Sequence, residues 1–462
     1  MPDISVLQHL TALPIEDKYL LHAPLFGINA FSNKEAVKAL QASLLAGASH
    51  EPRPGPLSSF IEEFDKDPLP EPGPPQSELS PPFLGIITTR SCNSRCLYCD
   101  FGAAEAPKRS MSLQTASSVV DWYSGILKKQ EREILEIHFF GGEPMAAPKV
   151  VQVVVHRARE VAAREGQIPF FEISTNGIVS KPLLGFLGDY FNTVVLSLDG
   201  PENIQNLHRP LRGGRDSFKK AYATAKYLSE SSAELVLRAC ISNANIDKME
   251  EITYWFCEAF NPSKINFEIM QPGKRAEEAG LFSPGPFEFA VNFIKARRAA
   301  ESYGIPVIYA SDLGGEPVYS SCPVGKDTII IDPDGRISSC YLLPDKWLEA
   351  GLNLEFGRIQ DNGEVAIDSS SVNRIRQIAL NKPRCENCFC RWSCAGGCHV
   401  GNSYPGCSSS YSDYCIQTRI ISACTILSQL EQEEKIDQLL LNRKALENLA
   451  LHPTDRLSEL IL

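Results

Sequence analysis

From residue 83 to residue 304 the chain alternates short apolar runs with longer stretches in which apolar residues recur every three or four positions. The first pattern is typical of buried strands and the second of helices that cover them. A helix is expected at Phe287–Tyr303, and strands are predicted at Phe83–Thr89, Glu136–Phe140, Phe170–Ser174, Thr193–Leu198, Glu234–Ile241 and Lys264–Met270. Such strands form a parallel sheet through right-handed crossovers, so we predict an α/β fold, an open, partial (β/α)6 barrel at residues 83–304.

Two regions precede the predicted barrel. Residues 1–50 are predicted to form a small α+β module with short strands at Lys18–His22 and Phe26–Phe31, followed by a helix that Ser32 or Asn33 caps. A module of this size rarely folds alone, so it should pack on the rest of the chain. Residues 51–82 hold ten of the 32 prolines and are predicted to be a semi-rigid, extended linker.

After about residue 305 the alternation stops and cysteines dominate the sequence. We predict a cysteine-rich domain at residues 305–424 and a helical segment at residues 425–462, where apolar residues return to helical spacing. The cysteines of this part are spaced Cys322-x17-Cys340, then Cys385-x2-Cys388-x5-Cys394-x3-Cys398, then Cys415.

Composition narrows the classes of function. Hydrophobic residues make up 43% and charged residues 22% of the 462, which is ordinary for a globular protein. A net charge of -11 argues against nucleic acid as a partner and favours the binding of a basic or neutral peptide. Neither an export signal nor a run of ~18 apolar residues is present, so we expect a cytoplasmic protein with no membrane partner. Fifteen cysteines in a reducing compartment indicate metal or cluster ligation rather than disulfides.

Residues capable of chemistry follow four of the predicted strands. The carboxyl ends of parallel strands meet at one edge of a sheet, where α/β enzymes collect their active-site residues. The segments in question are Cys92 after the first strand, Gly141–Pro144 after the second, Ser174–Gly177 after the third and Ser197–Gly200 after the fourth. We therefore expect all four segments to lie at one opening, or mouth, of the predicted barrel.

The spacing Cys-x3-Cys-x2-Cys at Cys92, Cys96 and Cys99 can hold a four-iron cluster by three corners, which leaves one iron free for another ligand. The alternatives are a zinc site completed by a histidine, or thiols that are together by chance. With Tyr98 before the last cysteine, the motif resembles the signature of the radical S-adenosylmethionine (SAM) superfamily. The resemblance implies that the free iron binds the amino and carboxylate groups of SAM and that its cleavage yields a 5′-deoxyadenosyl radical.

The resemblance also implies SAM contacts at the other strand ends. The glycines of a Gly-Gly-Glu motif would let the backbone approach the methionine end of SAM, and the acid would steady its ammonium group. An arginine after the fourth strand would pair with a carboxylate of SAM or substrate, and its alternative is a solvated loop arginine. The residues so implied, with Tyr98 as a further cofactor contact, are Gly141, Gly142, Glu143, Ser174, Asn176, Asp199 and Arg209.

The later cysteines resemble the SPASM extension, which holds auxiliary iron–sulfur clusters. The match includes Gly335, five positions before Cys340. One auxiliary cluster, expected to be [4Fe-4S], would be held by Cys385, Cys388, Cys394 and Cys415, and a second by Cys322, Cys340 and Cys398. The alternative is a zinc ribbon on the four cysteines between residues 385 and 398.

The match departs from the SPASM pattern at two positions. The cluster at Cys322 lacks a fourth cysteine upstream, so its fourth iron is open or is closed by Glu316 or Cys407. Sulfatase-maturing relatives carry a catalytic aspartate where Tyr341 stands, which weakens that assignment. The remaining cysteines are expected to be buried or spare thiols, namely Cys240, Cys257, Cys390 and Cys424.

Residues 18–45 resemble part of the peptide-recognition element of enzymes that tailor ribosomally made peptides. The resemblance implies a radical SAM/SPASM maturase that removes hydrogen from a precursor peptide and forms a carbon–carbon, ether or thioether crosslink. A small flavodoxin- or ferredoxin-type protein would supply electrons. The alternatives are a SPASM enzyme that acts on a protein side chain, like a sulfatase maturase, or on a small molecule, and a zinc-stabilised binding protein without catalysis.

Overall fold

The structure, a computed structural model, describes residues 9–45, 64, 67–76, 78–99, 101, 103, 109–311, 315–360, 362–402, 411–452 and 454–460. Its strands form two sheets, one of eleven strands and one of three. Half of the predicted linker lies outside the described residues, and its described residues 67–76 and 78–82 contain no helix or strand.

Six parallel strands form the centre of the large sheet, as the sequence predicts. They are β4 (Leu84–Ile87), β5 (Ile134–Phe140), β6 (Ile168–Thr175), β7 (Thr193–Ser197), β8 (Glu234–Ile241) and β9 (Lys264–Ile269). In the described part of the chain the sheet has two edges, β10 (Val307–Ile308) and β14 (Val365–Ile367), so the barrel is open. The fold is the α/β, partially closed arrangement expected from the alternation.

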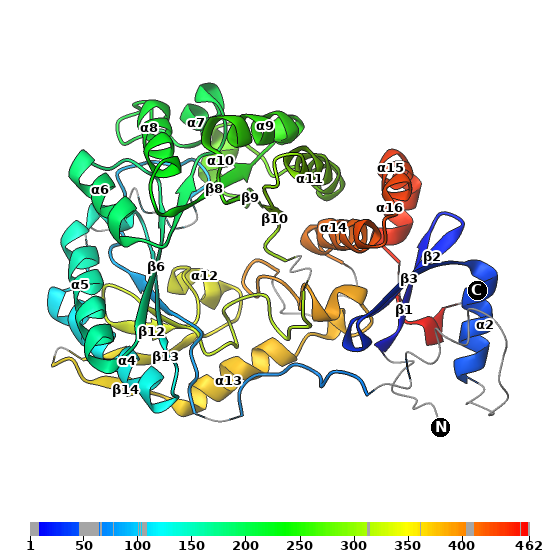
Figure 1. Cartoon of the computed structure of the whole chain (residues 1–462), viewed down its shortest axis with the longest axis horizontal. Helices are drawn as coiled ribbons and strands as arrows, with labels where there is room; N and C mark the ends of the chain where they lie inside the picture. Colours follow the sequence, from blue (N-terminus) through cyan, green and yellow to red (C-terminus); the bar gives the residue numbers. More distant parts are fainter. Residues whose placement is uncertain are drawn as a thin grey trace.

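Helices line the outer side of the curved sheet (Figure 1). They are α4 (Leu113–Lys129), α5 (Pro148–Glu165), α6 (Lys181–Tyr190), α7 (Glu202–His208), α8 (Phe218–Ser229), α9 (Met249–Phe260), α10 (Lys274–Glu278) and α11 (Pro286–Glu301). Alternate residues of each strand enter the core beneath them; Leu135, Ile137 and Phe139 of β5 are buried. Because side chains alternate along a strand, the residues between them face the inner, concave side.

The cysteine-rich part continues the same sheet across the predicted boundary at residue 304. Strand β11 (Ile329–Ile331) pairs in parallel with β4, and β12 (Arg336–Ser338), β13 (Glu355–Ile359) and β14 follow in antiparallel order. These strands were not predicted, because runs of three to five residues show no periodicity. Two helices, α12 (Pro344–Glu349) and α13 (Ser369–Leu380), complete this region. The sheet thus joins the second cysteine region directly to the first barrel strand.

The N-terminal module contains three strands rather than two. Strands β2 (Lys18–Ala23) and β3 (Ile28–Asn33) and helix α2 (Lys34–Leu45) agree with the prediction, whereas β1 (Thr11–Ile15) was missed. Strand β1 contains Pro14, a residue that sheets tolerate at an edge. The backbone N–H of Ala36 donates to Asn33 Oδ1 at 2.9 Å, which caps α2 as expected.

The C-terminal segment supports this module. Helices α14 (Asp413–Gln429), α15 (Glu433–Leu441) and α16 (Arg443–Ala450) form it, and Figure 1 shows α15 and α16 beside the small sheet. Leu457 and Leu460 enter the core of the module, and Gln41 Nε2 donates to both of their carbonyls, at 2.6 and 2.9 Å. The expectation that the module packs on the rest of the chain is therefore confirmed. Short 3-10 turns lie at Pro24–Phe26, Pro144–Ala146, Ile246–Lys248, Pro383–Cys385, Phe389–Trp392 and Leu457–Glu459.

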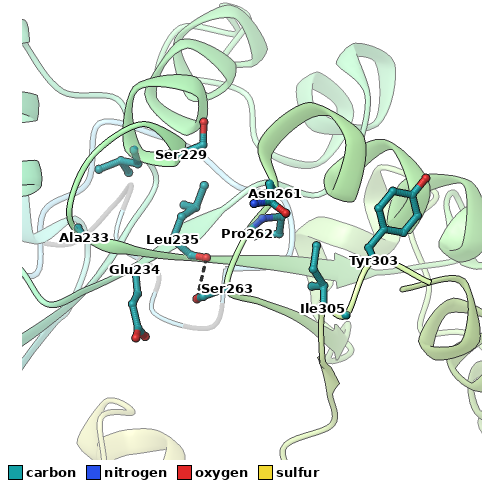
Figure 2. Close-up of a pocket in the computed structure, with 11 residues that line it drawn as sticks. Ser229, Ala233, Glu234, Leu235, Asn261, Pro262, Ser263, Tyr303 and Ile305 are labelled. Carbon is teal, nitrogen blue, oxygen red and sulfur yellow. Dashed lines mark hydrogen bonds between the residues drawn. The ribbon is translucent and has the colours of Figure 1, made fainter. Parts of the chain in front are cut away.

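A pocket of about 340 Å³ lies at the amino ends of β8, β9 and β10 (Figure 2). Glu234 and Ser263 stand at its strand ends, and the Ser263 hydroxyl donates to the carbonyl of Leu235 at 3.1 Å. The candidate residues lie at the opposite, carboxyl ends of the strands, so this pocket is separate from them. None of the described helices is long and apolar enough to cross a membrane.

Candidate active site

The three cysteines Cys92, Cys96 and Cys99 lie together in the loop after β4. Burial raises the pKa of the Cys96 thiol to about 12, and the neighbouring thiols of Cys99 and Cys92 add to this shift. Burial, the Glu143 carboxylate and Cys99 likewise raise the pKa of Cys92 to about 11. Thiols in such surroundings ionise readily only when a cation binds them, which is the chemistry of a cluster ligand.

Asn176 holds the cysteine loop against the end of β6. Its Nδ2 donates to Cys92 Sγ at 3.5 Å, to Asn93 Oδ1 at 2.7 Å and to Ser94 Oγ at 3.1 Å. The backbone N–H of Ser94 donates to Cys92 Sγ at 3.3 Å. The sequence resemblance implied a SAM contact at Asn176; its contacts in the structure are with the loop that carries the first cysteine.

The two glycines after β5 pack on the backbone that leads to Cys92. Gly141 has φ of +135°, and a Cβ there would lie 2.6 Å from the carbonyl oxygen of Thr89. A Cβ on Gly142 would lie 2.2 Å from the carbonyl oxygen of Ser91, a distance that real side chains do not adopt. The N–H of Gly142 donates to Thr89 at 3.0 Å. Glycine is therefore required here by backbone packing, and its expected contact with SAM remains a prediction.

Glu143 links the ends of β5 and β6. The side chain is 1% exposed, and its oxygens accept hydrogen bonds from the Thr175 hydroxyl at 2.8 Å and the backbone N–H groups of Asn176 and Met145 at 2.7 and 3.0 Å. Burial raises its pKa against the opposing effect of these donors. Through these hydrogen bonds the carboxylate ties the loop after β5 to the end of β6.

A buried polar network anchors Tyr98, the aromatic residue between the second and third cysteines. Asp199 Oδ2 accepts hydrogen bonds from the Tyr98 hydroxyl at 2.6 Å and from Arg209 Nε at 2.9 Å, and lies 3.2 Å from His208 Nδ1. Burial would raise the pKa of Asp199, but Arg209 and His208 hold it below its usual range. The Arg209 guanidinium also lies over the Tyr98 ring, and its side chain is only 11% exposed, unlike a solvated loop arginine.

The concave face of the sheet carries polar residues that the sequence interpretation missed. Glu136 Oε1 lies 2.7 Å from His138 Nε2, and Glu172 Oε1 lies 3.6 Å from His138 Nδ1. Arg238 and Glu268 form a further pair at 3.4 Å on β8 and β9. Ser174 follows Glu172 by two residues on β6, so by strand alternation the two side chains lie on the same face of the sheet. The available signal was the polar residue at every second position of otherwise apolar strands.

Tyr341 connects the second cysteine region with the mouth of the barrel. Its ring lies 4.8 Å from that of Phe140, and its hydroxyl occupies the space directly above Gly85 of β4. It packs in the same apolar cluster as Cys92 and Cys99 while following Cys340 in the chain. Burial, then the carboxylates of Glu172 and Glu136, raise its pKa.

The structure brings the later cysteines into the two groups that the resemblance implied. Burial raises the pKa of Cys340, and the charges of Cys322 and Cys398 add to this shift. Burial also raises the pKa of Cys322 to about 11, and Cys398 acts in the same direction. In the other group, the thiol of Cys394 is surrounded by Cys385, Cys388 and Cys415, which add to the effect of burial on its pKa.

Apart from Cys398, no other described cysteine is among the main charges that act on the thiols of Cys322 and Cys340. Cys407, a candidate for the fourth ligand, lies outside the described residues. Cys240 and Cys257 are buried, as expected, and Cys390 and Cys424 are buried too. The fourteen described cysteines are free thiols rather than disulfides. Among the described His, Cys, Asp and Glu side chains, no group of three is arranged to hold a single metal ion. The donor chemistry, partly buried thiols in groups of three, three and four, fits iron–sulfur clusters.

Comparison with known families gives two matches. The model of the radical SAM superfamily matches residues 86–253, and that of the SPASM iron–sulfur cluster-binding domain matches residues 322–391. The first covers the strand ends that carry the barrel cysteines, and the second covers four of the seven later ones, Cys322, Cys340, Cys385 and Cys388.

Individual relatives are distant. The chain is 22% identical to the radical SAM cyclopropyl synthase TigE of Paramaledivibacter caminithermalis, over 68% of this chain and 67% of the relative. It is 23% identical to the PqqA peptide cyclase of Gluconobacter oxydans, over 74% and 93%. A serine-type anaerobic sulfatase-maturating enzyme of Klebsiella aerogenes is 22% identical over 67% and 77%.

Two solved structures share the fold. Native anSMEcpe with bound AdoMet and Cp18Cys peptide aligns with a TM-score of 0.59 at 18% identity, over 78% of this chain and 99% of the other. Streptococcus suis SuiB bound to S-adenosylmethionine aligns with a TM-score of 0.53 at 13% identity, over 85% and 95%.

Proposed function

The chain belongs to the radical SAM superfamily and carries a SPASM domain, and on this premise we propose that it matures a ribosomally made precursor peptide by forming a crosslink within it. The observation that carries the proposal is the arrangement of two cysteine groups at one barrel mouth. Cys92, Cys96 and Cys99 lie at the strand ends, and Tyr341 brings the Cys340 group to the same mouth.

In this proposal Cys92, Cys96 and Cys99 hold a four-iron cluster, and its fourth iron binds SAM. When bound, the two supply a 5′-deoxyadenosyl radical that removes hydrogen from an unactivated carbon. The residues of this chain fix the site. Asp199 and Arg209 anchor Tyr98 and so the second half of the cysteine loop, while Asn176 holds the first half.

We place the binding site of the reacting peptide residue on the concave face of the sheet. Its side chains retain access to solvent; Glu136 is 33% and Glu172 31% exposed. Tyr341 and Phe140 form an apolar wall between this face and the cysteine loop. A peptide side chain that enters between the polar strand positions and this wall lies beside both cysteine regions.

The N-terminal module is the proposed docking site for the leader part of the precursor. Strand β3 pairs with β2 on one side, and no described strand pairs with its other side. An exposed strand edge of this kind accepts an extended peptide as an additional strand. The relatives that act on or bind peptides by name, PqqA peptide cyclase and peptide-bound anSMEcpe, support a peptide substrate.

Crosslinking removes two hydrogens from the precursor. One leaves as a hydrogen atom, and the second leaves as a proton and an electron when the new bond has formed. The two later cysteine groups are the proposed holders of clusters that accept this electron. An external flavodoxin- or ferredoxin-type protein is the proposed donor of the electron that starts each cycle.

A second candidate is the oxidation of a protein side chain, as in a sulfatase-maturating enzyme, and a relative of that name supports it. Tyr341 weighs against it, because the resemblance places the catalytic aspartate of those enzymes at this position. We therefore place peptide crosslinking first.

Co-expression with any short peptide that is encoded beside the gene of this chain tests the proposal. Mass spectrometry of the purified peptide should show the loss of two hydrogens, and fragmentation should locate the bridge. A peptide that returns unmodified beside fully loaded enzyme would contradict peptide crosslinking. Zinc without iron and sulfide in protein purified without oxygen would contradict radical chemistry altogether.

A further inference from the structure

Helix α14 carries a buried arginine one turn after the last cysteine of the four-cysteine group. Arg419 follows Cys415 by four residues, so both lie on one face of the helix. The Arg419 side chain is 1% exposed, and its Nη1 donates to Cys388 Sγ at 3.4 Å. A fully buried guanidinium therefore touches the sulfur of one proposed cluster ligand and shares a helix face with another.

Other contacts hold Arg419 in place. Its Nε donates to the carbonyl of Ala450 at 3.0 Å and its Nη2 to that of Leu449 at 2.8 Å, at the C-terminus of α16. The Tyr411 hydroxyl accepts from Nη1 at 3.2 Å, and the Tyr411 ring lies 4.3 Å from the guanidinium carbon. With its planar donors fixed on several sides, the side chain is positioned rather than mobile.

Asp455 balances the charge of Arg419 beside the same sulfur. The pair is bidentate, with Nη1 on Oδ2 at 2.5 Å and Nη2 on Oδ1 at 2.9 Å, and Asp455 is fully buried. Asp455 Oδ2 also accepts from the backbone N–H of Phe389 at 2.9 Å, the residue after Cys388. A buried ion pair adds little net stability over apolar packing, so its position next to the sulfur calls for another account.

We propose that the Arg419–Asp455 pair sets the reduction potential of the cluster held by Cys385, Cys388, Cys394 and Cys415. The inference rests on the proposed function, which assigns this cluster. Hydrogen bonds to cluster sulfurs and nearby positive charge favour the reduced state, and negative charge disfavours it. Arg419 raises the potential and makes the cluster a better electron acceptor, while Asp455 limits the rise.

The test is a redox titration of the cluster-loaded, full-length protein, followed by electron paramagnetic resonance. The signal of this cluster is identified by its loss in Cys385→Ala. Arg419→Gln should lower the midpoint potential, Asp455→Asn should raise it, and Arg419→Lys should fall between wild type and Arg419→Gln. The double variant Arg419→Gln/Asp455→Asn should lie between the two single variants.

A matched control uses the buried pair of Arg376 and Asp327, in which Arg376 Nε donates to Asp327 Oδ1 at 2.8 Å. The charges that act most strongly on Arg376 are those of Asp327 and Tyr319, not of a cysteine. Arg376→Gln and Asp327→Asn should leave the midpoint of the Cys388 cluster unchanged.

Opposite shifts of the two single variants separate electrostatic tuning from structural loosening, which would move both in one direction. Shifts of the same sign, or an unmoved midpoint with the iron content of wild type, would overturn the inference. If the Arg419 variants do not fold, Asp455→Asn alone decides, because it must move the midpoint upward. A wild-type protein without iron at the Cys385 group would instead contradict the proposed function.

Discussion

The two cysteine regions each contain a buried arginine–aspartate pair, and the two pairs do different work. At the barrel mouth, Arg209 and Asp199 bind Tyr98 and hold strand ends together, and their hydrogen bonds end on oxygen and nitrogen atoms. In the C-terminal region, Arg419 donates directly to the sulfur of Cys388. The thiols also differ, because burial raises the pKa of Cys96 to about 12, whereas a hydrogen bond from Cys390, assisted by Arg419, lowers that of Cys388 to about 7.

The difference indicates a division of labour. The first region is built from four separate strand ends and is arranged to hold a loop, which suits a cluster that must present an open iron. The second lies between a loop and the start of α14, with a cation against sulfur, which suits a cluster that only accepts and passes electrons. The following substitutions test this comparison.

The largest effect is expected from Cys388→Ala. Loss of a ligand in the four-cysteine group should stop formation of the crosslinked peptide but spare SAM cleavage, because Cys92, Cys96 and Cys99 remain. Mass spectrometry of the peptide and chromatography of 5′-deoxyadenosine measure the two activities in one reaction. Cys257→Ala, which removes a buried thiol of α9, is the control and should preserve both. Equal loss of both activities in Cys388→Ala would refute the division.

Asp199→Ala tests whether the first pair is structural. It leaves the Arg209 cation buried without its partner, which typically costs about 3–5 kcal/mol of the free energy of unfolding. Urea denaturation of metal-free protein measures the change. The partly exposed pair of Arg157 and Asp121, whose side chains are 26% and 38% exposed, is the control, since Asp121→Ala should cost about 0–1 kcal/mol. A loss at Asp199 no larger than that at Asp121 would show that the network does not hold the strand ends.

Gly142→Ala should disturb the first region alone. The added Cβ would lie 2.2 Å from the carbonyl oxygen of Ser91, so the loop that carries Cys92 must shift. Iron analysis after reconstitution should show loss of the barrel cluster with the C-terminal clusters retained. Gly125→Ala, on α4 with no atom near its Cβ position, should load fully. Full loading of Gly142→Ala would contradict the packing argument.

The smallest effect is expected from Cys390→Ala. The Cys390 thiol donates a hydrogen bond to the sulfur of Cys388, and Cys390 is not among the proposed ligands. Its removal should leave the iron content unchanged and lower the midpoint potential less than Arg419→Gln does. A fall in iron content would identify Cys390 as a ligand instead.

The barrel strands and the cysteine groups could be read from the sequence because both signals are local. An apolar run such as Phe83–Thr89 and a spacing such as Cys-x2-Cys need only a few neighbouring residues. Strands β11 to β14 are too short to show the alternation of apolar and polar residues. Strand β1 was missed because it contains Pro14, a residue that sequence analysis does not expect in a strand. The position of Tyr341 over Gly85, and the pair of Arg419 with Asp455, depend on segments far apart in the chain. Such contacts follow from packing, which no sequence pattern records.

The predicted SAM contacts show the same limit of sequence analysis, because a motif does not record which atoms its residues contact. Glycine at positions 141 and 142 was expected from a motif, but the structure gives its cause as close backbone approach to Thr89 and Ser91. Glu143 was expected to face an ammonium group, and its oxygens accept hydrogen bonds from Thr175, Asn176 and Met145. The motif thus predicts which residues gather at these strand ends, whereas the contacts of each residue are seen only in the fold.

The most direct test of the account is the conversion of SAM to 5′-deoxyadenosine by the anaerobically reconstituted, chemically reduced protein. The account predicts that wild-type protein forms 5′-deoxyadenosine, that Cys388→Ala does so as well, and that Cys96→Ala forms none. No 5′-deoxyadenosine from wild-type protein with a full complement of iron and sulfide, or an undiminished yield from Cys96→Ala, would contradict it.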